Sequence, residues 1–510
     1  FFLTIAIEFC NYCKSFVYLD ESDSVRFNVK TMYQSIARKG VRQSVAVYRR
    51  SLSTNGYLNE TEIPTFHFQK SLPVLPLPKL EESLTRYLNS ATPLISEESL
   101  AHTKALVDQF GREEGPALQQ ELERLMKTEF KGSSFISKFW FDKYLEDRAC
   151  LPINYNPMIT FKNDPDPAKM DQAVRAASLI YSSVAFFRTL RDGKLEPDIF
   201  HTKPEKSKNN NTFNKLVKML PESLSWYGGY AAGAYALDMS QYDNLFQSTR
   251  LPGKVKDTIQ TYPRSRHIVV QRGTDFFSFP VLTDSGDSVS HAEIEATIRN
   301  ILNRKESSSP AVSLLTSMAR DKWFDERQKL IADAKNMESL EAIDSAMFVV
   351  CLEDTAPEGN VSEARCMLHG DGRNRWYDKS FQLIVAQNGR SSVNFEHSWG
   401  DGVAVLRYFE EVYKESITQA PLASDQLPNP SPNLKTLEWN LGADVVKTID
   451  DAGKTLDSML ASIHMEIIDT DAVYPRFLKD NGLGADGTFQ MGFQLAHYKL
   501  HGFSASTYES

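Results

Sequence analysis

The strongest constraint on the fold comes from the stretch FQLIVAQNGRSSVNFEH, residues 381–397. Two runs rich in β-branched and aromatic residues flank Asn388-Gly389, a dipeptide that favours a tight hairpin turn. A second hairpin is predicted for residues 267–282, and residues 345–354 have the length and apolar content of a buried strand. Because these strand signals alternate with helical patterns, the sequence predicts an α/β fold and leaves the strand order open.

Helical periodicity recurs along much of the remaining chain. In residues 71–88, three prolines hold the first part extended, so a helix there can begin only after Pro78. A Pro/Ser/Asn-rich stretch, residues 416–433, is typical of a flexible linker. The other predicted helices cover residues 97–128, 168–191, 402–415, 439–463 and 485–502.

Charge and cysteine content narrow the classes of protein to which the chain can belong. The 510 residues suffice for two ordinary domains, and the net charge of -9 argues against a nucleic-acid binder, which needs basic surface. No run approaches the roughly 18 consecutive apolar residues of a membrane span. The five cysteines are odd in number and scattered, which favours a reducing compartment. Cys10 and Cys13 form a CxxC without a second pair, a weak signal for a metal or redox site.

The region before residue 63 has the composition of a targeting segment. From Met32 to the first acidic residue, Glu60, the chain contains five Arg or Lys residues and several serines. Such a segment is typical of a mitochondrial transit peptide, and a basic surface helix is the alternative. We therefore interpret residues 32–62 as a transit peptide and residues 1–31 as an extension upstream of the natural start.

Residues 200–230 combine a basic polar stretch with a short amphipathic helix. Apolar side chains with lysines beside them are suited to lying on an anionic membrane surface. A helix packed against the core, with its lysines in solvent, is the alternative. The apolar stripe consists of Phe213, Leu216, Val217 and Leu220, flanked by Lys215 and Lys218.

His397 begins the motif HSWGDG, directly after the predicted strand. A histidine at a strand end has a pKa suited to proton transfer, and Asp401 could reach back to Nδ1 and leave Nε2 as the acceptor. No GxSxG elbow or cysteine-protease signature accompanies the motif, so the histidine is predicted to activate a substrate hydroxyl or thiol directly. A histidine with only a structural role is the alternative.

Four longer stretches carry a resemblance to a known family. They are SLPVLPLPKLEESLTRYL, SLSWYGGYAAGAYALDMSQYDNLFQSTRLP, MLHGDGRNRWYDKSFQLIVAQNG and FEHSWGDGVAVLR. Together they resemble the carnitine/choline acyltransferase family, and the branch that transfers long acyl chains at the mitochondrial inner membrane. The similarity extends from about Ile63 to Ser510.

The resemblance implies a fold and a reaction. The fold is the two-domain carnitine acyltransferase fold, which resembles that of chloramphenicol acetyltransferase-like CoA-dependent acyltransferases. The reaction is reversible transfer of long-chain acyl groups between CoA and L-carnitine for fatty acid β-oxidation, with both molecules as substrates and no permanently bound cofactor or metal. His397 is implied as the general base and Asp401 as the residue that orients it.

The resemblance also implies substrate-binding residues. For carnitine these are Tyr144 in WFDKYL, and Tyr508 and Ser510 in the terminal TYES. For CoA they are Lys479 and Asp486, although an aromatic core role for Tyr144 and a solvated loop lysine at position 479 are the alternatives. The CoA stretch departs from the family pattern, because Pro475 and Gly482 stand where basic residues are expected and Gly484-Ala485 replaces Ser-Pro.

The same resemblance divides the chain into parts. Residues 63–433 are expected to form an N-terminal acyltransferase domain, with 200–230 as its membrane-associating insert, and residues 434–510 part of a second domain. Family motifs of the types GRTET and STS are expected beyond residue 510, so the second domain is predicted to be incomplete and the polypeptide as written inactive. The implied setting is peripheral, on the matrix side of the inner mitochondrial membrane, as a monomer. A carnitine acyltransferase of shorter chain preference and a non-catalytic truncated product are the alternatives.

Overall fold

The computed structural model describes residues 58, 60–305, 309–422, 425, 427–468 and 473–507. Within them the chain forms two compact units. The first unit contains the described residues of 73–144 and 468–507, and the second contains those of 58–72 and 145–467. The upstream extension, nearly all of the predicted transit peptide, and the Cys10-Cys13 pair lie outside the described residues.

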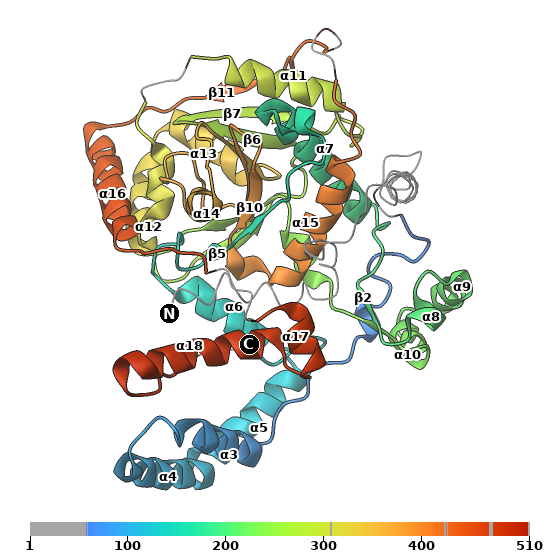
Figure 1. Ribbon diagram of the computed structural model, residues 1–510, viewed down its shortest axis with the longest axis vertical. Coiled ribbons are helices and arrows are strands. Elements are labelled where there is room, and N and C mark those ends of the chain that lie inside the picture. The colour runs from blue at the N-terminus through green and yellow to red at the C-terminus, as the bar shows by residue number, and fades with distance from the viewer. Residues whose placement is uncertain are drawn as a thin grey trace, which may run out of the picture. The chain divides into compact units, whose positions relative to one another are not determined.

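A seven-stranded mixed sheet forms the centre of the second unit (Figure 1). Its strand order is β1-β10-β9-β8-β6-β7-β11, with β8 parallel to both β6 and β9 and the remaining neighbours antiparallel. Both predicted hairpins and the predicted buried strand, β8, are confirmed. The strands are β1 (Met158–Thr160), β6 (His267–Arg272), β7 (Asp275–Pro280), β8 (Val349–Glu353), β9 (Phe381–Ala386), β10 (Ser391–Phe395) and β11 (Lys435–Leu437).

The β9–β10 hairpin fixes the point at which the chain leaves the sheet. Gly389 in its turn has φ +77°, a left-handed conformation that favours glycine. A Cβ at this position would lie 2.2 Å from the Met170 carbonyl oxygen, so a larger residue has no room. The register pairs Phe395 at the end of β10 with Phe381 at the start of β9, and β1 covers the other edge of β10. The residues after Phe395 therefore start from an internal, fully buried strand.

Helices cover both faces of this sheet (Figure 1). On one face the stacked rings of Phe348 and Phe381 meet Tyr408 of α15. On the other, Trp323 of α12, Ile343 of α13 and aliphatic residues of α16 pack together in one core. The first layer consists of α7 (Gln172–Arg191), α11 (His291–Leu302) and α15 (Gly402–Ser416), and the second of α12 (Arg320–Ile331), α13 (Ala334–Ser345) and α16 (Ala443–Ala461).

Helix α7 is confirmed as a helix but is not amphipathic. All of its residues except Tyr181 and Arg191 are buried, because it packs against both α11 and α15 as well as against the sheet. A helix that is enclosed on all sides carries small and apolar residues around its whole circumference. The helix predicted for residues 168–191 is therefore correct, but it has no solvent-exposed face.

The first unit is helical in its described part. The helix predicted for residues 97–128 is divided at Glu113, because Pro116 lacks the amide hydrogen and its ring excludes a helical turn before it. Helix α3 begins after Pro78, as predicted. The elements are α3 (Leu80–Ala91), α4 (Glu97–Arg112), α5 (Glu114–Lys127), α6 (Ser137–Glu146, which ends in the second unit), α17 (Pro475–Asp480) and α18 (Ala485–His501).

The insert at residues 200–230 does not present its apolar stripe as one face. Phe213 and Val217 are buried against Phe68 and Ala234, whereas Leu216 on the same helix, α9, is exposed. For Phe213 and Val217 this agrees with the alternative interpretation, in which the helix packs against the core. The smaller elements of the second unit are β2 (Ile199–His201), β3 (Ala234–Ala236), β4 (Ser248–Leu251), β5 (Thr258–Thr261), α8 (Pro204–Ser207), α9 (Asn211–Met219), α10 (Ser225–Ala231) and α14 (Asn360–Leu368).

Candidate active site

His397 lies on a single turn of 3-10 helix, η6 (His397–Trp399), between β10 and α15. Its side chain is half-buried, and its ring centroid lies 5.7 Å from that of Phe395. Two residues further on, Trp399 is buried and its indole Nε1 donates a hydrogen bond to the Ser380 carbonyl oxygen at 2.9 Å. The turn is thus fixed at both sides of a partly accessible imidazole, a suitable arrangement for proton transfer.

Glu396 holds the same turn from within the protein. One carboxylate oxygen accepts hydrogen bonds from the Ser398 amide at 3.1 Å and from the Ser398 hydroxyl at 2.5 Å. The other accepts from Nη1 of Arg250 on β4 at 2.9 Å. Glu396 and Arg250 are both fully buried. The residue directly before His397 therefore has its carboxyl group in the core, paired with an arginine of a distant strand.

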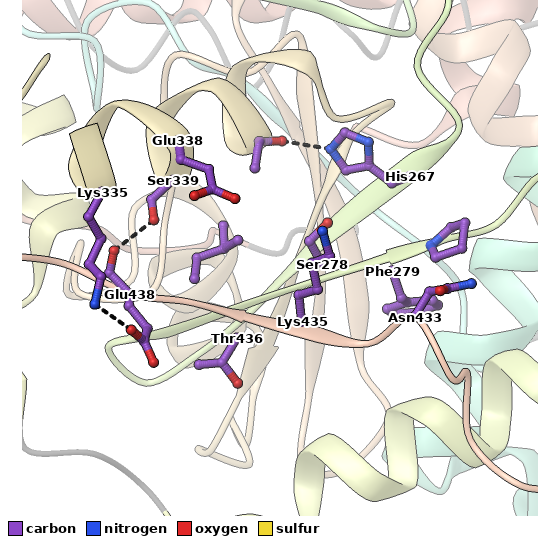
Figure 2. Close-up of a pocket in the computed structure, with 13 residues that line it drawn as sticks. His267, Ser278, Phe279, Lys335, Glu338, Ser339, Asn433, Lys435, Thr436 and Glu438 are labelled. Atoms are coloured by element: carbon purple, nitrogen blue, oxygen red, sulfur yellow. Dashed lines mark hydrogen bonds and ion pairs between the residues drawn. The ribbon is translucent and has the colours of Figure 1, made fainter.

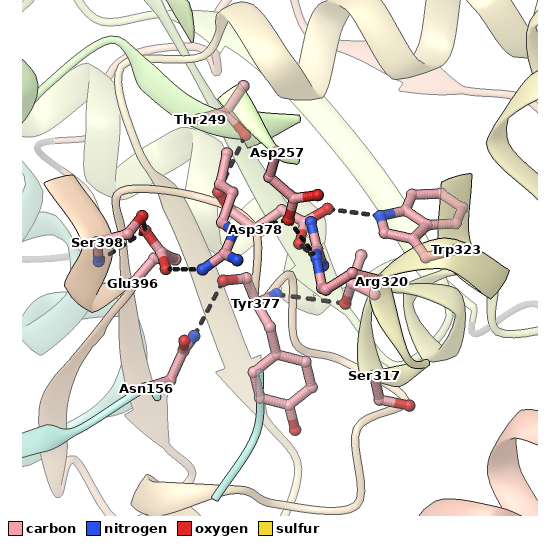
Figure 3. A network of polar contacts seen from close by, with 12 residues as sticks. Asn156, Thr249, Asp257, Ser317, Arg320, Trp323, Tyr377, Asp378, Glu396 and Ser398 are labelled. Carbon is pink, nitrogen blue, oxygen red and sulfur yellow. Dashed lines mark hydrogen bonds and ion pairs between the residues drawn. The ribbon is translucent and has the colours of Figure 1, made fainter. Parts of the chain in front are cut away.

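The Arg250–Glu396 pair belongs to a larger network of buried charges (Figure 3). Arg250 Nε donates to Asp257 at 2.8 Å, and Arg320 Nε donates to the same carboxylate oxygen at 2.6 Å. Arg320 Nη1 also donates to Asp378 at 2.6 Å, and the Trp323 indole donates to the other oxygen of Asp378 at 2.6 Å. The network links β4, α12 and the segment before β9 to the turn that carries His397.

The pKa shifts favour the charged forms of Arg250 and Asp257, whereas burial raises the pKa of Asp378 at the other end of the network. Burial lowers the pKa of the Arg250 guanidinium, but the carboxylates of Glu396 and Asp257 outweigh burial and raise it overall. Burial likewise raises the pKa of Asp257, but the guanidiniums of Arg320 and Arg250 hold it below its usual range. Removal of one partner from such a buried pair costs about 3–5 kcal/mol, because the other charge is left uncompensated.

Asp401 is the N-cap of α15. Its carboxylate accepts a hydrogen bond from the Gly402 amide at 2.7 Å, and its own amide donates to Oε1 of Gln241 at 2.8 Å. The side chain is exposed. A carboxylate at this position caps the helix and stabilises the helix dipole. The orientation of His397 by Asp401 stays a prediction beside this capping role.

The predicted carnitine and CoA residues that the structure describes lie in the first unit. Tyr144 is on α6, and its ring packs edge-to-face on Trp140 with centroids 5.6 Å apart. Lys479 is in the last turn of α17 and Asp486 in the first turn of α18, where their charges complement the helix dipoles. The predicted roles of Tyr508 and Ser510 fall outside the described residues.

A cavity of about 470 Å³ opens elsewhere in the second unit, between α13 and strands β6, β7 and β11 (Figure 2). Lys335 pairs with Glu438 at 2.6 Å across it, and Nε2 of His267 lies 2.7 Å from the Ala342 carbonyl oxygen. Burial lowers the pKa of His267. None of the predicted site residues lines this cavity, so we do not assign it to the reaction.

Several groups around His397 could not be found from local sequence. Nothing in the residues around Arg250, Asp257 and Arg320 indicates that they share one network, and only the fold makes them neighbours. In the part of the chain that the structure describes, no cluster of three or more His, Cys, Asp or Glu residues could hold a metal ion. Among its helices, none is both long and apolar enough to cross a membrane.

Comparison with known proteins places this geometry in a family. The family model described as Choline/Carnitine o-acyltransferase matches residues 75–510. The chain is 42% identical over 462 residues to Carnitine O-palmitoyltransferase 2, mitochondrial, of Rattus norvegicus, which covers 89% of this chain and 69% of that protein. Its human counterpart is 42% identical over 463 residues, with the same coverage. Human Choline O-acetyltransferase is 30% identical over 466 residues, covering 87% of this chain and 57% of that protein.

Carnitine acyltransferases take coenzyme A and carnitine as substrates rather than as resident cofactors. The α/β fold, with a histidine turn at the end of an internal strand, agrees with the fold that the sequence resemblance implied. The family match covers most of the chain, including the whole of the sheet and the turn. The chain is an acyltransferase and belongs to the choline/carnitine acyltransferase family.

Proposed function

We propose that this protein reversibly transfers long-chain acyl groups between CoA and L-carnitine, a carnitine O-palmitoyltransferase activity. The main support for the proposal is that His397 is partly accessible and lies on a turn that is anchored at both sides. The higher identity to the carnitine palmitoyltransferases than to the choline acetyltransferases favours carnitine as the acceptor. The proposed mitochondrial location is supported by the names of the same relatives, and the role in β-oxidation follows from the family resemblance.

The proposed reaction needs no acyl-enzyme intermediate. Nε2 of His397 takes the proton from the carnitine hydroxyl as that oxygen attacks the thioester carbonyl carbon. The tetrahedral intermediate collapses, the C–S bond breaks, and the CoA thiolate receives the proton from the imidazolium. In the reverse direction the same nitrogen takes the proton of the CoA thiol. Asp401 is proposed to stabilise the imidazolium.

Substrate contacts are proposed for five residues. Tyr144, Tyr508 and Ser510 are assigned to carnitine, whose quaternary ammonium is attracted to aromatic faces and whose carboxylate suits hydroxyl donors. Lys479 and Asp486 are assigned to CoA. Lys479 is exposed, as a phosphate-binding lysine must be.

The protein is proposed to act as a monomer on the matrix side of the inner mitochondrial membrane. Support comes from a set of exposed apolar side chains in the insert, here called the insert patch. Basic residues Lys215 and Lys218 stand beside it and would attract anionic lipid headgroups. The insert patch consists of Leu216, Met219, Leu224, Tyr227 and Tyr230.

Acyl exchange between palmitoylcarnitine and CoA tests the proposal. The protein expressed from its complete coding sequence is compared with its His397→Ala variant, with octanoylcarnitine and acetylcarnitine as competing donors. We expect palmitoyl transfer to exceed transfer of the shorter chains, and the variant to lose activity by about 100-fold or more. Equal activity of variant and wild type would show that His397 is structural, and a preference for acetyl or octanoyl groups would reassign the substrate.

A further inference from the structure

The backbone of His397 is enclosed by the side chain of the residue before it. The Glu396 carboxylate folds past the histidine and accepts hydrogen bonds from the amide and the hydroxyl of Ser398. The ring closed in this way contains both peptide bonds of His397. Rotation of either peptide would break a hydrogen bond to a buried charged acceptor, which is stronger than one between neutral groups. The conformation of the turn is thus coupled to the position of one carboxylate.

The position of that carboxylate is set from outside the turn. Its two oxygens serve different partners, since one holds Ser398 and the other accepts from Arg250. Arg250 cannot follow a moving Glu396, because its Nε is held by Asp257. Asp257 is held in turn by Arg320 at 2.6 Å (Figure 3). Arg148 also donates a hydrogen bond to Asp257, at 2.8 Å. The position of the turn therefore depends on residues of other elements, outside the motif HSWGDG.

Stability alone is a weak reason for this arrangement. Buried ion pairs can often be replaced by apolar residues of similar volume without loss of stability, because desolvation offsets the attraction between the charges. Unlike an apolar contact, the hydrogen bonds between a fixed guanidinium and a carboxylate are directional. Because each oxygen of the Glu396 carboxylate makes a charge-assisted hydrogen bond to a different partner, the position of the whole carboxylate is fixed. A general base needs such definition, since an error of about 1 Å in its placement can cost about 100-fold in rate.

We propose that Glu396, anchored by Arg250, is a positioning residue that sets the orientation of the His397 side chain for proton transfer. This inference rests on the proposed function of His397 as the base. Since Glu396 acts through the histidine, its loss affects the turnover number. The substrate affinities do not depend on it.

The test is steady-state kinetics of palmitoyl transfer by the full-length protein carrying Glu396→Gln. Glutamine keeps the shape and one acceptor but removes the charge that Arg250 requires. Asp344→Asn is the matched control, because Asp344 is also a buried carboxylate paired with an arginine, Arg327, and it has no described contact with η6. The folded fraction of each variant is measured by circular dichroism and thermal unfolding, and kcat is expressed per folded molecule.

We expect Glu396→Gln to lower kcat by about 10- to 100-fold with both KM values within about twofold of wild type, and Asp344→Asn to keep kcat within about twofold. Wild-type kcat in Glu396→Gln, a loss confined to KM, or an equal loss of kcat in the control would overturn the proposal. Full activity of His397→Ala would instead show that His397 is not the general base, and would contradict the proposed function on which this inference rests.

A second variant covers the case in which Glu396→Gln does not fold. Ser398→Ala removes only the hydroxyl donor and leaves the backbone hydrogen bond and the ion pair in place. We then expect kcat about fivefold lower with unchanged KM, the effect of one hydrogen bond. An unchanged kcat in Ser398→Ala would count against the proposal.

Discussion

Gln241 and Asp401 are 160 positions apart in the chain, and Oε1 of the glutamine accepts the aspartate amide at 2.8 Å. The same amide oxygen packs over Gly400, where an added Cβ would lie 3.3 Å from it. A side chain from a different segment therefore closes over the loop between η6 and α15. This contact gives a structural reason for the glycine before Asp401.

Loss of this contact should slow the reaction mildly. In Gln241→Leu the Asp401 amide loses its acceptor, a change of about 1 kcal/mol that corresponds to a kcat about fivefold lower. Gln241→Glu keeps an oxygen at the same position and should retain most of the rate. Palmitoyl transfer by the two variants and wild type measures the difference. If the leucine variant reaches the wild-type rate, the loop does not depend on this hydrogen bond.

Asp401 combines a capping role that the structure shows with an orienting role that is predicted. Asparagine also caps helices well, whereas alanine does not, so Asp401→Asn should leave the free energy of unfolding within about 0.5 kcal/mol and Asp401→Ala should lower it by about 1 kcal/mol. If the charge also stabilises the imidazolium, both variants should lose kcat by at least about tenfold. Urea unfolding and kcat are measured on the same samples. Wild-type kcat in the asparagine variant would limit Asp401 to capping.

Local signals predicted the elements that determine the position of His397. The Asn388-Gly389 dipeptide marked the hairpin, since a turn with positive φ admits few other residues. The helix that starts at Gly402 was predicted from its apolar spacing. Both signals are local, because the residues that determine the turn and the helix lie within the turn and the helix themselves. The short segment between them, which carries the histidine, was therefore placed correctly at a strand end.

Features that depend on distant partners were not predictable. Nothing near Arg250 or Asp257 indicates that these residues are fully buried, because their partners come from other elements and burial of a charge needs all of them together. For the same reason Phe213 and Leu216 look equivalent in the sequence, although Phe213 is buried and Leu216 is exposed. The single helix predicted for residues 97–128 was wrong for a different reason, since Pro116 is a local signal for the break that the prediction did not use.

The insert patch should bind membranes through its most exposed side chains. Leu216 is 61% exposed and Met219 81% exposed, so each is free to enter the interfacial layer of a bilayer. Because burial of one such side chain is worth about 1.5–3 kcal/mol, the double variant Leu216→Glu/Met219→Glu should partition at least tenfold more weakly, in order of magnitude, into vesicles containing anionic phospholipid.

Val255→Glu provides the control for this measurement, since Val255 is 77% exposed and lies outside the insert patch. Cosedimentation with vesicles is measured for all three proteins at low and high salt. The control should sediment like wild type, and high salt should weaken the binding of both. Equal sedimentation of the double variant and wild type would remove the insert patch as a membrane contact.

His291 should make the stability of the second unit depend on pH. It begins α11, its Nε2 lies 3.2 Å from the Ser178 hydroxyl of α7, and its ring packs edge-to-face on Tyr181. Burial, followed by the charge of Lys169, lowers its pKa from 6.5 to about 4. The folded protein therefore keeps this imidazole neutral at pH values at which the unfolded chain protonates it. The stabilisation is complete above pH 6.5 and is lost as the pH falls toward 4.

Between pH 7.5 and pH 5.0 this single group should lower the free energy of unfolding by about 2 kcal/mol. His291→Gln keeps a polar partner for Ser178 but cannot titrate, so its stability should fall by about 2 kcal/mol less than that of wild type over the same interval. Urea unfolding followed by tryptophan fluorescence at the two pH values measures both differences. The comparison cancels the other titrating groups, because they are common to the two proteins. Parallel losses of stability in wild type and variant would show that His291 takes up its proton equally well in the folded and unfolded chains.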